Sequence, residues 1–329
     1  MEVVEMIREY QNRVLGTNKA DFENLALELY RFQSKYNPVY REYIQSLGRD
    51  PEKAKTLRDI TFLPISFFKT HKVATGNWIP EKTFESSGTT GMETSKHHVF
   101  SLEFYLKIAE QIFQEFYGPL EEYSFLGLLP SYLERDNSSL VAMVKHFIDV
   151  SGHGGFYLNN HEALLEAVDN ARKNGKKCFI IGVTFGLLDL AEQHDTDLSD
   201  CVIMETGGMK GRRKEMVRQE VHDFLGSAFN SPSIHSEYGM TELLSQAYSK
   251  GEGIFQTKGS MRILLRESTD PFSYINKGSG GINVIDLANV HSCCFIETQD
   301  IGRIHPDGQL EILGRFDNSD VRGCSLMAV

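Results

Sequence analysis

The chain has 329 residues, of which 41% are hydrophobic, and its formal net charge is −11. This length and apolar content suffice for a large core and about two lobes. The acidic charge, with no block of lysines or arginines, argues against nucleic acid as a partner. No apolar run approaches the ~20 residues that cross a bilayer, so no membrane span is expected. The five cysteines show no paired spacing, which favours a reducing compartment, the cytoplasm.

Helical periodicity dominates the beginning of the chain. Residues 1–15 carry charges among their apolar residues, which is typical of a surface helix rather than a secretory signal. From Val3 to about Leu47 the apolar spacing predicts two or three packed helices. Further on, residues 101–117 predict a helix that Ser101 caps and whose apolar stripe lies in the core.

The middle and the end of the chain differ in their predicted strands. Apolar runs at 123–129 and 177–183 predict strands. They alternate with helical patterns at 139–150, 161–174 and 185–193. This alternation is typical of βαβ units and a mostly parallel sheet. Beyond Gly251, shorter alternating strands predict a smaller β-rich lobe at 261–266, 281–287, 293–297 and 309–313.

A segment rich in glycines and hydroxyls lies upstream of the first of these helices: Ser86, Ser87, Gly88, Thr89, Thr90 and Gly91. Its two glycines let the backbone bend sharply and approach a ligand, while hydroxyls and amides can bond phosphate oxygens. Lys96 can supply a counter-charge. The spacing is neither that of a Walker loop nor that of a Rossmann loop. The composition favours a phosphate-binding loop over a plain surface turn.

Two later clusters carry groups that suit a nucleotide. In the run 237–242, the ring of Tyr238 can stack on a purine, a hydroxyl can bond a phosphate, and a carboxylate can hold magnesium. In the run 298–303, Asp300 is expected at a strand end, where it can accept hydrogen bonds from both ribose hydroxyls. An Asp-x-Gly sequence such as that at 300–302 is, by itself, more often a plain turn than a ligand site.

Together and in this order, the motifs S-S-G-T-T-G, Y-G-M-T-E, T-Q-D and G-R-F-D, between Ser86 and Asp317, resemble the adenylate-forming superfamily of acyl-CoA and aryl-acid ligases and luciferases. The resemblance implies an α/β fold, namely an adenylate-forming large domain with parallel-sheet α/β subdomains and a smaller β-rich lobe. It also implies ATP as the nucleotide and Mg²⁺ as the metal.

The resemblance further implies roles for particular residues. Residues 86–91 would bind the triphosphate, Thr241 would contact the α-phosphate, and Glu242 would hold magnesium. The ribose and adenine would be bound by the remaining matched residues: Tyr238, Gly239, Asp300 and Arg315, with Gly207 and Gly208 lining the adenine and carboxylate pocket.

The end of the chain departs from ordinary members of the superfamily, which continue past the G-R-x-D hinge into a mobile domain with a catalytic lysine. Here the sequence stops soon after Asp317, so that domain and its lysine are expected to be missing. The cation that faces the α-phosphate is then left open between three lysines: Lys96, Lys210 and Lys258. The tail 322–327 is similar to that of the acyl-protein synthetase family of the bacterial luminescence fatty-acid reductase complex.

In that family a tail cysteine accepts the acyl group, so the resemblance implies this role for Cys324. Arg322 and Gly323 beside it would give positive charge and access, which favour the reactive thiolate. The expected organisation is an adenylate-forming core over 1–313 and a hinge and tail over 314–329. Within the core we expect three regions, at 1–50 (helical), about 51–250 (α/β body) and about 251–313 (β-rich lobe).

The predicted function is ATP-dependent activation of a carboxylic acid, by resemblance a fatty acid, as an acyl-adenylate. Cys324 would then take the acyl group and pass it to an acyl-reductase or acyl-carrier protein, with Thr241, Glu242 and Lys96 as further catalytic residues. One alternative is a ligase core that uses coenzyme A or a carrier protein as acceptor. Another is a non-catalytic nucleotide-binding subunit.

The histidines lack the spacing of metal ligands. They are interpreted as surface or pocket residues: His97, His98, His153, His235 and His291.

Overall fold

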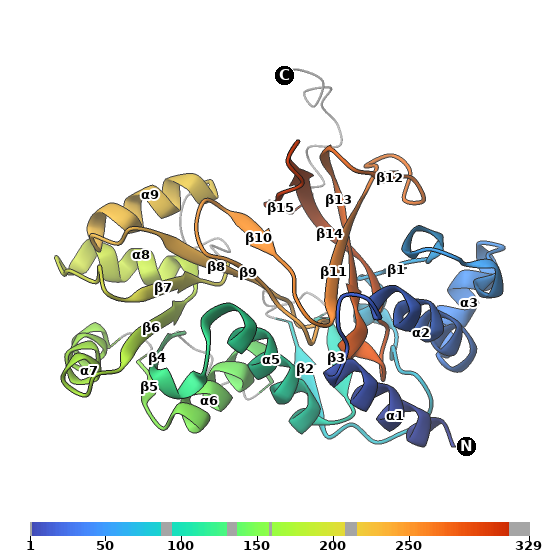
Figure 1. Ribbon diagram of the computed structural model, residues 1–329, viewed down its shortest axis with the longest axis horizontal. Helices are drawn as coiled ribbons and strands as arrows, with labels where there is room; N and C mark the ends of the chain where they lie inside the picture. The colour runs from blue at the N-terminus through green and yellow to red at the C-terminus, as the bar shows by residue number, and fades with distance from the viewer. Residues whose placement is uncertain (1, 87–93, 130–136, 158–159, 208–215, 316–329) are drawn as a thin grey trace.

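A mixed sheet forms the centre of the molecule (Figure 1). The computed structural model describes residues 2–86, 94–129, 137–157, 160–207 and 216–315. Within these ranges thirteen strands form one sheet, in the order β12-β11-β13-β14-β15-β10-β9-β8-β7-β6-β4-β5, with β1 beside β14. Strands β2 and β3 form a separate antiparallel hairpin.

The helices of the described residues are α1 (Val3–Leu15), α2 (Phe22–Tyr36), α3 (Pro38–Ser46), α4 (Phe67–Thr70), α5 (Leu102–Tyr117), α6 (Ser139–Ser151), α7 (His161–Lys173), α8 (Thr184–Gln193) and α9 (Arg218–Ala228). The first half of the strands comprises β1 (Leu63–Pro64), β2 (Lys82–Glu85), β3 (Lys96–Val99), β4 (Tyr123–Leu128), β5 (Gly154–Phe156), β6 (Lys177–Gly182) and β7 (Val202–Glu205). The second half comprises β8 (Ile234–Tyr238), β9 (Ala247–Ser249), β10 (Ile254–Gln256), β11 (Met261–Arg266), β12 (Tyr274–Ile275), β13 (Gly278–Asp286), β14 (Phe295–Ile304) and β15 (Leu310–Arg315).

The parallel half of the sheet runs through β8, β7, β6, β4 and β5, as the βαβ pattern predicts. Its strands are apolar on both faces because helices cover both. Phe125 of β4 and Phe179 of β6 pack with α5 and α6, whereas their neighbours Leu126 and Ile180 pack with α7, α8 and α9. Figure 1 shows α8 and α9 on the opposite side of the sheet from α5 and α6.

The predicted cap of α5 is confirmed. The Ser101 hydroxyl accepts a hydrogen bond from the Phe104 backbone N–H at 3.2 Å, which satisfies one of the free donors of the first turn. The predicted stripe of this helix is buried at Phe104, Ile108, Ile112 and Phe116. Helical spacing therefore identified both the start and the inner face of α5.

The antiparallel half contains the strands that the sequence assigns to a β-rich lobe, and it continues the same sheet through β9 and β10. The expectation that Asp300 ends a strand is wrong, since β14 runs on to Ile304. Residues 300–304 pair with β15 across a tight hairpin, and this pairing keeps the strand extended past Asp300. The division into domains stays a prediction.

The N-terminal helices support this half of the sheet. Gln33 of α2 is fully buried, and its Nε2 donates to the carbonyls of Asn289 and Val290 at 2.9 and 3.0 Å. Its Oε1 accepts from the Cys294 N–H at 2.8 Å. An amide side chain that donates and accepts in this way satisfies buried backbone groups of an irregular segment. Gln33 thereby fixes the course of residues 289–294, which run behind the site described below.

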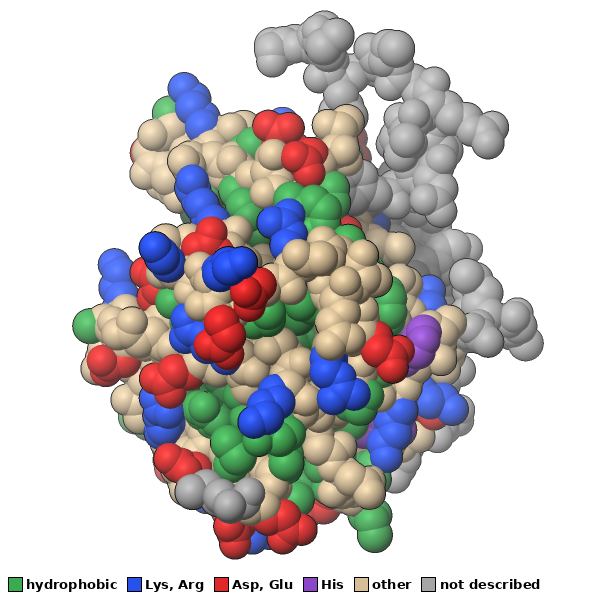
Figure 2. Space-filling model, turned by 90° about the vertical axis from the view of Figure 1, so that its right-hand side faces the viewer, with side chains coloured by type: hydrophobic (Ala, Val, Ile, Leu, Met, Phe, Trp, Pro, Cys, Tyr) green, Lys and Arg blue, Asp and Glu red, His purple; other side chains and the backbone are tan. Residues whose placement is uncertain are grey.

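Charged side chains of both signs lie among hydrophobic ones on the face that Figure 2 shows. Among the described helices, none has the length and the apolar character needed to cross a membrane.

We expect Phe113→Ala to destabilise the fold by about 3 to 5 kcal/mol, because it leaves a cavity at the centre of the α5 interface. The Phe113 ring is 1% exposed and lies 5.0 to 5.3 Å from the rings of Phe147, Phe179 and Phe125. Urea unfolding measures the loss. The matched control is Phe224→Ala on α9, since Phe224 is 38% exposed and should cost less than about 1 kcal/mol. Equal losses in the two variants would contradict this view of the core.

Candidate active site

Tyr238, Asp300 and Arg315 come together from three strands. Tyr238 ends β8, and its hydroxyl donates to Asp300 Oδ2 at 2.7 Å. Arg315 is the register partner of Asp300 across the pairing of β14 with β15, and its Nε lies 3.6 Å from Asp300 Oδ1. Burial raises the pKa of Asp300, while the Tyr238 hydrogen bond and the charge of Arg315 oppose that rise. The sequence thus predicted residues that the fold brings into one cluster.

Glu242 lies beside this cluster, in the connection between β8 and β9. Its side chain is buried, and burial raises the pKa of its carboxyl group. A hydrogen bond from the Ser95 side chain and the charge of Arg315 act in the opposite direction, whereas the charge of Asp300 adds to the rise. The ionised forms of Glu242 and Asp300 therefore repel each other, and a cation placed between them would stabilise both.

Ser86 and Ser95 hold together the two ends of the predicted phosphate loop. The Ser95 N–H donates to Ser86 Oγ at 2.9 Å, and the Ser86 N–H donates to the Ser95 carbonyl at 3.1 Å. Because Ser95 also bonds the Glu242 carboxyl group, the ends of this segment lie next to the acidic cluster.

Several predicted site residues lie outside the described residues: Ser87, Gly88, Thr89, Thr90, Gly91, Gly208, Lys210 and Cys324. Lys96 is described and exposed, and strand alternation puts its side chain on the opposite face of β3 from the buried Ser95 and His97. Gly207 has a φ of +63°, a conformation that favours glycine. A Cβ at Gly239 would lie 2.2 Å from Glu237 Oε1, so a larger residue there would require the Glu237 carboxyl group to move.

A hydrogen-bond network around the buried Glu205, at the end of β7, was not predicted from the sequence. Glu205 accepts hydrogen bonds from the Gly207 N–H at 2.9 Å and from the Thr184 and Ser236 hydroxyls at 3.0 and 2.8 Å. It also pairs with Arg218, whose Nε lies 3.3 Å from Glu205 Oε1. The nearest sequence signal was its place just before two glycines, which alone does not distinguish a ligand-facing acid from a structural one.

Glu205 stays ionised in spite of its burial. Burial acts to raise its pKa, but hydrogen bonding with His222, the charge of Arg218 and the other donors outweigh it and lower the pKa to about 2. The other end of the Arg218 guanidinium donates from Nη1 to the Ile312 carbonyl on β15. One arginine therefore ties the Gly207 turn to the strand that carries Arg315.

Glu237 has the opposite electrostatic environment. Burial, with a further contribution from the negative charge of Glu205, raises the pKa of its carboxyl group to about 8. On β8 it alternates with Ser236 and Tyr238, so it points to the other face of the strand. It is a neutral acid at neutral pH.

The interpretation of the histidines as surface or pocket residues is wrong for His97 and His291. Both side chains are fully buried, and their rings stack with centroids 5.6 Å apart and planes 11° apart. The two residues are far apart in the sequence, so no local pattern could have predicted the contact. In the described part of the chain, no three His, Cys, Asp or Glu side chains are grouped as a metal site.

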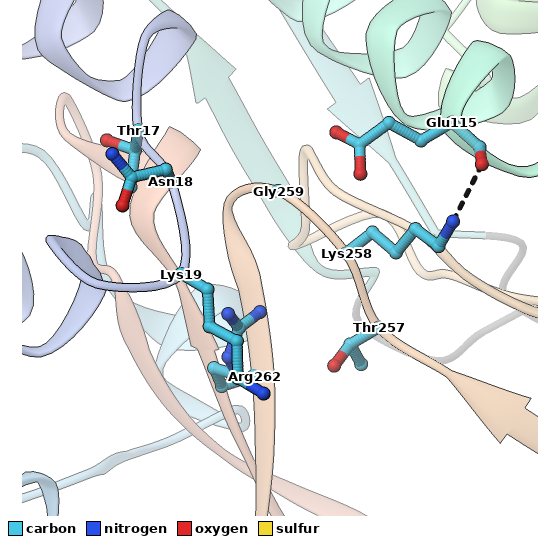
Figure 3. A pocket seen from close by; sticks show the side chains of 8 residues that line it. All are labelled: Thr17, Asn18, Lys19, Glu115, Thr257, Lys258, Gly259 and Arg262. Atoms are coloured by element: carbon cyan, nitrogen blue, oxygen red, sulfur yellow. Dashed lines mark hydrogen bonds between the residues drawn. The ribbon is translucent and has the colours of Figure 1, made fainter.

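A hollow of about 380 Å³ lies between the loop after α1, the end of α5 and the loop between β10 and β11 (Figure 3). Lys258, one of the alternatives for the α-phosphate cation, lines it. Its Nζ donates to the Glu115 carbonyl at 2.7 Å and lies 4.6 Å from the centroid of the Phe116 ring. Arg262 similarly donates to the Met261 carbonyl and lies over Phe22. These cations are held by groups of the protein, and neither Asp300 nor Glu242 lines this hollow.

Solved structures with the same fold are ligases of the adenylate-forming type. An ATP-bound chimera of RpMatB and BxBclM aligns with a TM-score of 0.55 and 14% identity, over 73% of this chain and 49% of its own. A long-chain-fatty-acid-CoA ligase from Archaeoglobus fulgidus gives 0.51 and 18%, over 71% and 51%. A 2-hydroxyisobutyryl-CoA ligase in complex with 2-HIB-AMP and CoA gives 0.59 and 11%, over 93% and 78%. The chain spans about half the length of the first two proteins.

The chain therefore has the fold of adenylate-forming, acyl-CoA synthetase-like enzymes. Within that class, the family model described as "Acyl-protein synthetase, LuxE" matches residues 16–328, and the chain belongs to this family. No curated protein sequence matches the chain.

The raised pKa of Glu237 predicts a specific pH dependence of stability. The folded chain keeps the Glu237 proton up to about pH 8, whereas the unfolded chain releases it near pH 4.5. Between these values the unfolded state binds fewer protons, so this group lowers the free energy of unfolding as pH rises. In urea unfolding, the free energy of unfolding of Glu237→Gln should rise relative to that of wild type by at most about 1.4 kcal/mol per pH unit from pH 5 to 8.

Glu162→Gln is the matched control for this experiment, since Glu162 is an exposed acid on α7. It should keep the wild-type pH dependence. A Glu237→Gln variant whose stability runs parallel to wild type over this range would contradict the assignment of a neutral buried acid.

Proposed function

We propose that this chain activates a carboxylic acid with ATP to give an acyl-adenylate and pyrophosphate, and then transfers the acyl group to its own Cys324. The observation that carries the first step is the cluster of Tyr238, Asp300 and Arg315 beside the buried Glu242. The family match supports the second step. A fatty acid is the proposed substrate, in line with the fatty-acid ligase among the structures of the same fold.

The cluster provides groups of the right kind for a nucleoside. Asp300 can accept hydrogen bonds from the two ribose hydroxyls, and the Tyr238 hydroxyl fixes one of its oxygens for that purpose. The Arg315 side chain is 71% accessible. Its guanidinium group can therefore reach a ribose or a phosphate while its Nε stays near Asp300. Gly207 and Gly239 keep the surrounding backbone open for close approach.

Glu242 fits the role of magnesium ligand. Magnesium bound to nucleotides is held through one or two carboxylates together with phosphate oxygens, so a single buried carboxylate meets the need. The raised pKa of Glu242 reflects a desolvated acid beside Asp300, which a divalent cation would stabilise in its ionised form. Bound there, magnesium would supply positive charge against the triphosphate.

In the first reaction, a carboxylate oxygen of the acid attacks the α-phosphorus of ATP. The bond from that phosphorus to the bridging oxygen breaks, and pyrophosphate takes the electron pair. Residues 86–91 would hold the leaving group through backbone N–H groups and hydroxyls, and Thr241 would bond the α-phosphate. Of the three lysines considered for the α-phosphate, Lys258 is engaged with the Glu115 carbonyl and Lys96 lies on the opposite face of β3 from His97, which leaves Lys210 as the proposed cation.

In the second reaction, the Cys324 thiolate attacks the acyl carbon of the mixed anhydride. The carbon–sulfur bond forms, the bond from that carbon to the AMP oxygen breaks, and AMP leaves. Residues 314–329 are proposed as a hinge and tail on a core that comprises residues 1–313. Arg315 lies at the start of this segment, and its contact with Asp300 supports a hinge that begins beside the proposed nucleotide site.

The thioester would then pass its acyl group to a partner, an acyl-reductase or an acyl-carrier protein. We place the reaction in the cytoplasm. The four cysteines among the described residues are free and buried, as suits a reducing compartment: Cys178, Cys201, Cys293 and Cys294.

Asp300→Asn should weaken ATP binding by about tenfold to a hundredfold, since a hydrogen bond to a charged acceptor is worth about 1.5 to 3 kcal/mol. Titration calorimetry with ATP and magnesium measures the change. Asp307→Asn in the exposed turn between β14 and β15 is the matched control and should bind as wild type does. Equal affinities in the two variants would exclude Asp300 from the nucleotide site.

Intact-protein mass spectrometry tests the complete proposal. After incubation with magnesium, ATP and a panel of fatty and aromatic acids, wild type should gain one acyl mass that hydroxylamine removes. Cys324→Ser should release pyrophosphate without gaining that mass, and Cys294→Ser, which replaces a buried thiol, should be labelled like wild type.

Pyrophosphate release without any adduct on wild type would instead assign the acceptor role to coenzyme A or a carrier protein. Neither pyrophosphate nor adduct, with any acid of the panel, would favour a non-catalytic nucleotide-binding subunit.

A further inference from the structure

The connection between β8 and β9 carries Thr241 and Glu242 on irregular, largely buried backbone. Such backbone has no ladder partners, so its N–H and C=O groups must be satisfied by other groups. Side chains from distant segments do this. His97 Nδ1 lies 2.9 Å from the Thr241 carbonyl oxygen, and Asn289 Nδ2 donates to the Glu242 carbonyl at 2.9 Å. Asp286 accepts from the Leu244 N–H at 2.7 Å.

His97 differs from the other two because of the strand on which it lies. Asp286 is the last residue of β13, and Asn289 lies in the turn that follows it, whose carbonyl Gln33 binds. His97 lies on β3, the strand that follows the predicted phosphate loop. Its bond to Thr241 is therefore a direct hydrogen bond between that hairpin and the connection after β8.

Because of strand alternation, the side chains of His97 and Ser95 point toward the same segment, the connection between β8 and β9. Residues two apart on a strand point to the same face. Ser95, just before β3, bonds the Glu242 carboxyl group, and His97 bonds the Thr241 carbonyl. Ser95 also bonds Ser86 at the other end of the loop. The loop ends and the two motif residues are thus linked through Ser95 and His97.

The ring of His97 is held in a single tautomer and orientation. A carbonyl oxygen can only accept, so Nδ1 carries the proton in this bond. The ring is fully buried, stacked on His291 and packed edge-on against Phe68 with centroids 5.8 Å apart. A side chain with this little freedom transmits the position of β3 to the Thr241 carbonyl.

We propose that His97 is a positioning residue, which sets Thr241 and Glu242 relative to the strand that follows the phosphate loop by donating from Nδ1 to the Thr241 carbonyl. This inference rests on the proposed function. His97 itself is buried behind the Thr241 backbone and acts through that carbonyl. Its loss should therefore affect adenylate formation more than binding of the acid.

The test compares three variants by pyrophosphate release at saturating magnesium and ATP. In His97→Leu the donor is gone, and we expect kcat to fall about tenfold to a hundredfold with the KM for the acid changed less than about threefold. In His97→Asn the amide N–H can take the place of Nδ1, and most of the kcat should return.

His291→Leu is the matched control. It removes an equally buried imidazole from the same stack, yet among the described residues the Thr241 carbonyl is bonded by His97 and not by His291. Its kcat should stay within about threefold of wild type at a similar loss of thermal stability. Equal kcat losses in His97→Leu and His291→Leu, or a His97→Asn variant as slow as His97→Leu, would overturn the proposal.

Hydrogen exchange separates this inference from the proposed function, because it needs no turnover. If wild type released no pyrophosphate with any acid, the proposed function would fail, whereas the positioning role could still be measured. His97→Leu should then speed exchange of the Leu244 and Ser245 amides at least about tenfold, while His97→Asn and His291→Leu should not. Unchanged exchange of these amides in His97→Leu would overturn the inference on its own.

Discussion

The backbone between β8 and β9 must leave the regular sheet and yet stay buried, and this constraint governs the arrangement of the candidate site. Its carbonyls and N–H groups are paired by His97 of the hairpin strand β3, by Asp286 at the end of β13 and by Asn289 in the turn after it. An unpaired buried backbone group costs about as much as a lost hydrogen bond. The motif residues Thr241 and Glu242 therefore keep their positions as long as these side chains do.

The site also lies where the two halves of the sheet join. β8 is the last strand of the parallel half, and it pairs antiparallel with β9, which leads into the half that carries Asp300 and Arg315. Among the contacts that cross this junction are those from Tyr238 to Asp300 and from Arg218 to the Ile312 carbonyl. A nucleotide bound here would contact both halves, so the relative position of the halves is part of its binding site.

Carboxyl groups in contrasting electrostatic environments lie around this junction. Glu205 is ionised, with its pKa lowered to about 2, because an arginine and several donors face it. Glu237, one strand away, has its pKa raised to about 8 because burial and the charge of Glu205 both oppose its ionisation. Asp300 and Glu242 also have raised pKa values and share the influence of Arg315. An added cation would therefore stabilise the ionised forms of Asp300 and Glu242, whereas Glu205 is already stabilised by its own donors and arginine.

The sequence by itself determined the local elements and the motif chemistry. The period of the apolar residues identified α5 and its cap at Ser101, and the alternation of patterns predicted the parallel strands, because side-chain spacing follows directly from helix and strand geometry. Residue types also identified Tyr238, Glu242 and Asp300 as nucleotide-binding candidates, and the family resemblance added Arg315. Only the tertiary structure decided which distant residues support them. His97 with Thr241, and Glu205 with Arg218, meet through chain folding, and β14 extends past Asp300 because β15 pairs with it. Such contacts leave no local pattern in the sequence, since their spacing is set by the packing of the whole chain.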